Sequence, residues 1–312
     1  MQTKVQVASI ILNYNSFEDL FLCIEDLKKQ KKINQSIIIV DNNSKKECRD
    51  NINKKIKVEK ILKVKELEIK DYKVIDKKII LKNSNYIIWS KENGGYSQGN
   101  NIGLNLAEII SAETALIINP DVRIKDEFYL EKLHKELMKN EEALCAGSSI
   151  KDIDGRYQSP LIELRFWDEI MWPLEIIAAL IGKKKSYIQK ITTDEVIEVE
   201  KISGCCLLLK LEKNKKSDYL DNNLFLYCEE SVLTSKIQTK KKKIIYIPYL
   251  EAYHMHKKTP KKKSLELFIK WCSSRQYYIQ NYNNNSMLKK KMMYFSLELR
   301  KKFYKLLLKG AK

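Results

Sequence analysis

Long apolar runs are missing from this chain of 312 residues. The longest uninterrupted one, Ile176 to Ile181, is far shorter than the roughly 20 residues that a membrane-spanning helix needs. We also expect no signal peptide, because Met1 to Lys4 leads directly into a strand-like segment. The sequence therefore predicts a protein that does not cross a bilayer.

Several familiar catalytic motifs are absent as well. The sequence has no Gly-x-Ser-x-Gly, no Walker loop, no HExxH and no CxxC pair, so hydrolase, ATPase and zinc-domain interpretations lose their usual supports. The seven cysteines are odd in number and lie mostly in apolar stretches. This usage is typical of reduced core residues in a cytoplasmic protein.

Acidic residues are few relative to basic ones. The chain has 40 Asp and Glu against 58 Lys and Arg, a formal net charge of +18. Much of the excess lies in residues 257–312, where 14 Lys and 2 Arg stand against two Glu. Nucleic acid, anionic lipid and nucleoside diphosphates are the partners that such a charge favours.

Strand-like and helix-like segments alternate over the first 250 residues, beginning with a β-branched run at Val5 to Tyr14. Ser16 and Asp19 have the spacing of a capping box. Lys-rich residues 45–82 predict a charged helix or a hairpin on the surface. Further strands are expected at 36–40, 86–90, 115–119, 203–210 and 244–248, and helices at 16–29, 98–111, 127–139, 230–240 and beyond 264. The alternation predicts an α/β fold with a largely parallel sheet.

Four polar segments stand where apolar runs stop. They are VDNNS (40–44), NGGYSQGNNIG (93–103), INPDV (118–122) and LYCEES (226–231). Ligands of open α/β sheets bind outside the carboxyl ends of the strands, so these segments are expected to converge. Taken singly, each also fits a structural role: an Asx turn, a glycine-rich turn, an Asn-Pro turn and acids in a first helical turn.

Together and in this order, the four segments resemble the family 2 inverting glycosyltransferases, specifically the bacterial branch of rhamnosyltransferases and other surface-polysaccharide transferases. The resemblance covers roughly the first 280 residues. Its most specific part is the glycine segment, which matches the family pattern N-x-G-[FY]-[AS]-x-G-x-N-x-G. It implies a GT-A fold with a mostly parallel central sheet over residues 1–258 and basic C-terminal helices over 259–312.

The resemblance also implies a donor site. Asp41 would accept a hydrogen bond from the base or ribose, the glycine segment would line the nucleotide and sugar pocket, and Arg275, within RQYYI, would bind the diphosphate. The residues expected to bind the donor are Asn13, Asp41, Asn93, Gly95, Tyr96, Gly99, Asn101, Asn119 and Arg275.

Metal and catalytic residues follow from the same resemblance. Asp121 would hold Mg²⁺ or Mn²⁺ with His254 close by, because a hard cation stabilises the departing diphosphate. Glu230 would be the base that takes the acceptor proton, and Glu229 would orient the acceptor. His256 has no assigned role.

The implied function is inverting transfer of a sugar from a UDP- or dTDP-linked donor, dTDP-rhamnose among them, to a hydroxyl of a growing, lipid-linked surface polysaccharide. Two alternatives stay open. Charge alone suggests a nucleic-acid-binding protein. Asn119 and Asn222, where relatives often have acids, suggest a catalytically inactive member that acts as an assembly partner.

The final expectation concerns location. Six apolar residues recur every three or four positions in the basic tail and share one helical face: Leu288, Met292, Phe295, Leu299, Phe303 and Leu306. Such a helix either packs on the catalytic domain or lies in a membrane interface with its basic residues on anionic headgroups. With the apolar stretch 172–182 as a second contact, we expect a cytoplasmic protein bound peripherally to the inner face of the cytoplasmic membrane. The oligomeric state stays open.

Overall fold

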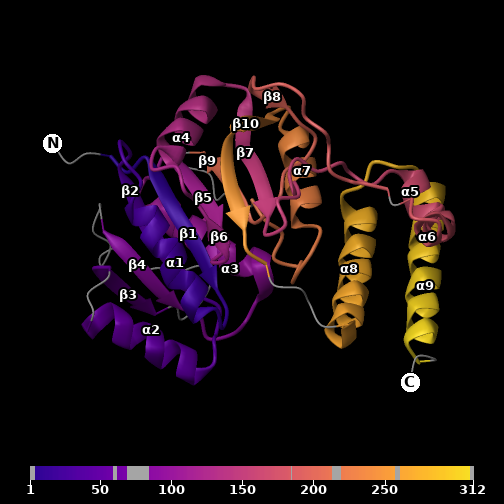
Figure 1. The fold of residues 1–312 in the computed structure, drawn as a ribbon, viewed down its shortest axis with the longest axis horizontal. Helices are drawn as coiled ribbons and strands as arrows, with labels where there is room; N and C mark the ends of the chain where they lie inside the picture. Colours follow the sequence, from indigo (N-terminus) through magenta and orange to yellow (C-terminus); the bar gives the residue numbers. More distant parts are fainter. Residues whose placement is uncertain are drawn as a thin grey trace.

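The computed structural model describes residues 4–58, 62–68, 84–183, 185–212, 219–256 and 261–309. One ten-stranded sheet has the strand order β3-β4-β2-β1-β5-β9-β7-β10-β6, with β8 paired to β10 (Figure 1). The strands are β1 Val7–Asn13, β2 Gln35–Asp41, β3 Val64–Glu68, β4 Asn85–Trp89, β5 Thr114–Ile118, β6 Val122–Arg123, β7 Ala143–Asp152, β8 Ile197–Glu198, β9 Cys206–Lys210 and β10 Lys243–His254.

Helices cover both faces of this sheet. The helices of the described residues are α1 Phe17–Lys28, α2 Lys46–Val58, α3 Gly95–Ile109, α4 Tyr129–Lys139, α5 Phe166–Ile170, α6 Trp172–Leu180, α7 Glu229–Thr239, α8 Lys261–Asn281 and α9 Met287–Lys309, and five of them (α1, α2, α3, α4 and α7) pack on the sheet. Residues of α1, α2 and α4 belong to one buried cluster, and those of α3 and α7 to another. Alternate residues of β1 supply both, because successive side chains of a strand point to opposite faces.

The first half of the sheet is parallel. Strands β3, β4, β2, β1 and β5 all run in the same direction, and Asn13 pairs with Asp41 at the ends of β1 and β2. The runs in β1, β2 and β5 are almost wholly buried, as expected of parallel strands covered on both faces. The predicted α/β fold with a mostly parallel sheet is confirmed.

The second half is mixed. β9 is antiparallel to both β5 and β7, whereas β7 and β10 are parallel.

The predicted capping box is wrong, because the Ser16 side chain makes no cap hydrogen bond and Asp19 pairs with Arg123 instead. Of the Lys-rich excursion, the described part is helix α2 followed by edge strand β3; residues 59–61 and 69–83 lie outside the described residues.

Helices α5, α6, α8 and α9 gather at one end of the molecule (Figure 1). A third core joins α8 and α9 to the start of α7. Its buried members are Leu224, Cys228, Val232, Cys272, Tyr278, Ile279, Met293 and Leu297. The expected boundary at 258/259 lies outside the described residues, so it stays a prediction. Within the described part of the chain, no helix combines the length and apolar character needed to cross a membrane.

Candidate functional site

The first part of the site lies at the ends of β1 and β2. Asp41 is completely buried, and its carboxylate accepts hydrogen bonds from the Ser44 amide (3.0 Å), Arg49 Nε (2.7 Å) and Asn13 Nδ2 (2.9 Å). Ser44 and Arg49 also line an open cleft of about 690 Å³, where the Arg49 guanidinium lies 5.4 Å from the Trp89 ring centroid. Ser44 and Arg49, which the sequence did not single out, therefore lie between Asp41 and the cleft.

Asn42 connects this strand end to the glycine segment. Its Nδ2 donates to Asn93 Oδ1 (2.8 Å) and to the Gly95 carbonyl (3.0 Å). Asn93 Oδ1 also accepts the Gly95 amide at 3.0 Å. Sequence reasoning missed Asn42, although its place directly after Asp41 in VDNNS was a usable signal.

Glycine is required at position 95. Gly95 has φ +82°, and a Cβ there would lie 2.1 Å from the Phe225 carbonyl oxygen, which accepts the Tyr96 amide at 2.8 Å. This backbone conformation and this close approach both exclude an ordinary side chain. The glycine segment is thereby fixed against the loop that precedes α7.

Two other predicted donor residues have structural contacts. Gly99 lets α3 approach β1, since a Cβ would lie 2.3 Å from a Leu12 methyl carbon. Asn101 Nδ2 donates to the Leu220 carbonyl (2.8 Å) and to Asn222 Oδ1 (2.7 Å). Both residues stabilise the wall of the site, and their predicted contact with the donor stays a prediction.

Tyr96 and Glu230 meet at Gly204. The Tyr96 hydroxyl donates to the Gly204 carbonyl at 2.5 Å, and the Gly204 amide donates to Glu230 Oε1 at 3.1 Å. Glu230 is partly exposed at the start of α7. The glycine segment and the predicted base are thus joined through one residue that sequence reasoning did not select.

The turn before α7 has an uncommon backbone. Tyr227 and Cys228 are consecutive non-glycine residues with φ of 76° and 67°. Each such residue costs about 1–3 kcal/mol and persists only where its surroundings hold it. This turn sets the directions in which Glu229 and Glu230 leave the backbone.

The two carboxylates differ in environment. Glu229 is buried, and its Oε1 has no hydrogen-bond partner among the described residues. Burial, followed by the neighbouring charge of Glu230, raises the pKa of Glu229 to about 8. At neutral pH Glu229 therefore keeps its proton and is not available as a base.

A second cluster lies at the junction of β5, β6 and β10. Asp121, His254 and His256 each offer a ligand atom, and these atoms lie within 4.8 Å of one another. Burial acts to raise the pKa of the Asp121 carboxyl, but the neighbouring imidazoles of His254 and His256 outweigh it and lower that pKa. His256 was left without a role by the sequence and belongs to this cluster.

The arrangement fits a divalent cation. His254 Nδ1 donates to Gln158 Oε1 at 2.7 Å, which leaves a lone pair on Nε2. That buried Nε2 has no hydrogen-bond partner among the described residues and lies 3.3 Å from Asp121 Oδ1. Two acceptors that face each other at this distance need a proton or a cation between them.

The cation cluster and Glu230 lie on either side of one short segment. The Cys205 carbonyl accepts the amide of Asn119, two residues before Asp121, at 2.8 Å. Gly204, the preceding residue, bonds Glu230. The structure thus brings residues 203–205 together with the INPDV and LYCEES segments.

Arg275 does not lie where the sequence predicts. Its side chain is 1% exposed, with Nε bonded to Glu169, one terminal nitrogen bonded to Glu163 and the other bonded to the Leu164 carbonyl. Each of these three nitrogens therefore already has a partner within the protein. The acids that bind it lie more than 100 residues away in sequence, so RQYYI alone carried no sign of this pairing.

Comparison with solved structures finds a similar fold in several glycosyltransferases. GalNAc-T7 with UDP, GalNAc and Mn²⁺ matches with a TM-score of 0.55 at 13% identity, covering 95% of this chain and 55% of that one. S. aureus TarS matches with a TM-score of 0.51 at 14% identity, covering 92% of this chain and 42% of that one. A mannosyltransferase from Pyrobaculum calidifontis, in complex with GDP-Man and Mn²⁺, matches with a TM-score of 0.53 at 11% identity. It covers 95% of this chain and 69% of that one. This chain thus spans about half the length of the first two.

A search of curated protein sequences finds no significant match. The model of glycosyl transferase family 2 matches residues 9–192, more than half of the chain. Most of β1 and all of β2 to β7 fall inside that match, together with the Asp41, glycine and Asp121 segments. The chain therefore belongs to glycosyl transferase family 2, and its fold is the α/β fold of the GT-A glycosyltransferases.

Proposed function

We propose that the protein transfers a sugar from a nucleoside diphosphate sugar to an acceptor hydroxyl with inversion at the anomeric carbon. The observation that carries the proposal is the placement of the Asp121 cluster and Glu230 on either side of Gly204–Cys205. One side offers ligands for a cation, and the other offers a partly exposed carboxylate. A cation can stabilise the leaving diphosphate, and a carboxylate can take the proton of the acceptor hydroxyl.

On the donor side, Asp121, His254 and His256 would hold the cation. Two imidazole nitrogens beside one carboxylate suit Mn²⁺ better than Mg²⁺, which prefers oxygen ligands. When bound, the ion would supply positive charge to the diphosphate that leaves. Gln158 fixes the ring of His254 so that Nε2 faces this position.

On the acceptor side, Glu230 would take the hydroxyl proton while the acceptor oxygen attacks the anomeric carbon and the bond to the diphosphate breaks. The Gly204 amide holds one carboxylate oxygen and leaves the other to accept the proton. Glu229, protonated at neutral pH, would donate a hydrogen bond and orient the acceptor.

The finer assignments belong to the same proposal. We propose a UDP- or dTDP-linked donor, with dTDP-rhamnose as one candidate, and a lipid-linked surface glycan as the acceptor. Family membership and the cleft beside Arg49 and Trp89 support a nucleoside-binding site. The predicted roles of Asn13, Asp41, Asn93, Tyr96 and Asn119 around the donor are retained.

We further propose peripheral binding to an anionic membrane through α6 and α9. The apolar face named from the sequence is exposed: Leu288 is 70%, Phe295 64% and Leu306 70% exposed. α9 packs on the protein through the opposite face, where Met293 and Leu297 are buried. Exposure of this face favours the membrane over packing on the catalytic domain.

Helix α6 extends the same surface. The Trp172 and Phe303 rings lie 5.4 Å apart, so the two helices adjoin, and Leu180 of α6 is 82% exposed. Exposed apolar side chains on two adjoining helices, one of them rich in Lys, offer a surface that anionic lipid would cover. It would bring the active site close to a lipid-linked acceptor.

The test is a calorimetric titration of nucleoside diphosphate sugars with and without Mn²⁺, followed by donor hydrolysis and transfer assays. We expect Mn²⁺-dependent binding of one nucleoside class and slow hydrolysis of its sugar. Binding without any hydrolysis would favour an inactive assembly partner. A salt-dependent shift with an oligonucleotide, and none with any sugar nucleotide, would favour the nucleic-acid alternative.

A further inference from the structure

Helix α8 contacts the strained turn that bears Glu229 and Glu230. The Ser274 hydroxyl of α8 donates to the Leu226 carbonyl, directly before the turn, at 2.7 Å. Cys228, within the turn, packs with Cys272 and Ile279 of the same helix. The turn is thus held from the side of the C-terminal region.

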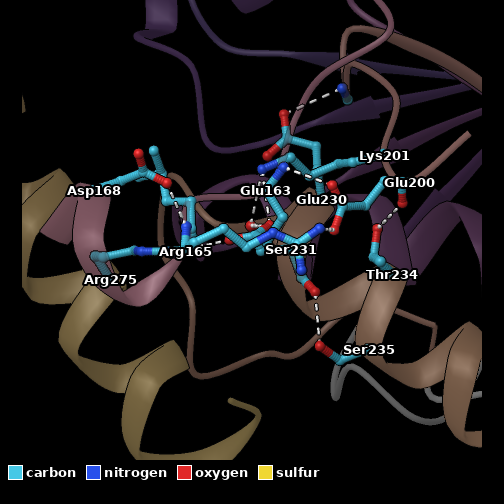
Figure 2. Close-up of polar contacts among 12 residues, drawn as sticks. Glu163, Arg165, Asp168, Glu200, Lys201, Glu230, Ser231, Thr234, Ser235 and Arg275 are labelled. Carbon is cyan, nitrogen blue, oxygen red and sulfur yellow. Dashed lines mark hydrogen bonds and ion pairs between the residues drawn. The ribbon is translucent and has the colours of Figure 1, made fainter. Parts of the chain in front are cut away.

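A buried ion pair holds the other end of the turn. Glu163 Oε2 accepts the hydroxyl of Ser231, the residue after Glu230, at 2.6 Å and Lys201 Nζ at 2.8 Å, while its Oε1 accepts from Arg275 of α8 (Figure 2). Burial acts to raise the pKa of Glu163, but the charges of Arg275 and Lys201 outweigh it and hold that pKa at about 2. Glu163 is therefore ionised wherever the enzyme works.

The loop leading to the turn has a third attachment. Asp221 Oδ2 accepts the hydroxyls of Tyr277 (2.7 Å) and Tyr282 (2.6 Å). Residues from Asp221 to Ser231 are thus tied to α8 at both ends, directly through Tyr277 and, at Ser231, through Glu163 and Arg275.

We propose that Arg275 and Ser274 of α8, together with Glu163, are positioning residues that hold the turn so that Glu230 faces the acceptor. This inference rests on the proposed function, because it assigns Glu230 the proton. A carboxylate on a strained turn is useful only where that conformation is held, and misplacement of a catalytic group by about 1 Å can cost about 100-fold in rate. The C-terminal helices thereby become part of the catalytic apparatus.

Neighbouring serines provide matched controls. Ser274→Ala removes one hydrogen bond from the turn, and Ser231→Ala removes two, the one donated to Glu163 and the one accepted from Lys201. Both variants leave Glu163 paired with Lys201 and Arg275. Ser273 bonds only its own helix at the Ile269 carbonyl, and Ser235 bonds the Ser231 carbonyl within α7. Ser273→Ala and Ser235→Ala are therefore the controls.

The readouts are kcat and donor KM for donor turnover, Mn²⁺-dependent nucleotide affinity, and amide hydrogen exchange over residues 227–231. For the double variant Ser231→Ala/Ser274→Ala we expect kcat to fall about ten-fold or more, donor KM and nucleotide affinity to stay within about two-fold, and exchange in the turn to accelerate. Arg275→Lys keeps the charge but loses the planar guanidinium that bonds Glu163 and Glu169 at once. It should likewise lower kcat and accelerate exchange in the turn.

Three outcomes would overturn the inference. They are kcat no lower than in the controls, unchanged exchange in the turn, and a fall in nucleotide affinity as large as the fall in kcat. Failure of the proposed function looks different, since it would show as no turnover of any nucleoside diphosphate sugar by the unaltered protein. Hydrogen exchange needs no turnover, so it tests the attachment of the turn in either case.

Discussion

The Gly204 amide lies 3.1 Å from Glu230 Oε1 and donates a hydrogen bond to it. A Cβ at position 204 would lie 3.0 Å from that same oxygen and 3.2 Å from the Tyr96 hydroxyl. We expect Gly204→Ala to displace both side chains and to lower turnover by about ten-fold or more. Gly155→Asn is the control, since Gly155 lies in a left-handed turn with nothing within 4 Å of its Cβ position. Equal turnover in the two variants would show that Glu230 tolerates displacement.

Replacement of the base should separate chemistry from binding. Glu230→Gln keeps the size and the hydrogen bond acceptor but cannot take the acceptor proton, so we expect turnover to fall by about two to four orders of magnitude. Donor affinity should stay the same. If Glu229→Gln abolishes turnover and Glu230→Gln does not, the two roles must be exchanged.

Glu229 should make the protein less stable in alkali. In the unfolded chain it ionises near its ordinary value of 4.5, whereas in the folded protein it keeps its proton up to about 8. Between these values the unfolded state binds fewer protons, so the free energy of unfolding falls as pH rises. We expect Glu229→Gln to be more stable than the unaltered protein at pH 8, by about 2–5 kcal/mol. Thermal melts at pH 4 and pH 8 check this, and the two proteins should melt alike at pH 4.

The Asp121 cluster should make nucleotide binding depend on metal. We expect UDP or dTDP affinity to fall on adding EDTA, and Asp121→Ala to abolish the difference between metal and EDTA. Asp154→Ala is the control, because Asp154 lies in an exposed turn paired with Arg156. An Asp121→Ala protein that still binds nucleotide more tightly with Mn²⁺ would remove Asp121 from this role.

The exposed face of α9 should bind anionic vesicles. Leu288→Gln/Phe295→Gln changes two exposed side chains and leaves the buried Met293 and Leu297 in place, so the fold should persist. We expect co-sedimentation with anionic but not neutral liposomes, weakened by salt and lost in the double variant. Met138→Gln, an exposed change on α4, should bind like the unaltered protein. Equal, negligible binding to both vesicle types would contradict the proposed binding to an anionic membrane.

Local patterns predicted the parallel half of the sheet well. β1, β2 and β5 are buried on both faces. Such strands have nearly continuous runs of β-branched residues, so the sequence indicates where each strand begins and ends. The antiparallel direction of β9 could not be predicted in the same way. SGCCLLLK has the same apolar character in either direction, and its partners β5 and β7 are selected by the whole chain.

The same limit applies to the site. Asp41, Gly95, Asp121 and Glu230 were selected because each ends or follows an apolar run in a specific motif. Arg275 was assigned to the diphosphate from the resemblance carried by RQYYI, and no local pattern reveals that Glu163 and Glu169 neutralise it. Gly204 was overlooked inside a run interpreted as strand, although a glycine beside a strand often marks close approach of another group.

Burial of the cysteines has a practical consequence. Six of the seven are buried, and Cys48 on α2 is partly exposed. Burial raises the pKa of the Cys48 thiol against the opposing hydrogen bond from Asn13, which itself bonds Asp41. Because Cys48 alone is partly exposed, a thiol-reactive fluorophore should attach selectively there, slowly at neutral pH and faster as the pH rises. The native sequence thus offers a single-site optical reporter beside the proposed nucleoside cleft, with no cysteine to remove.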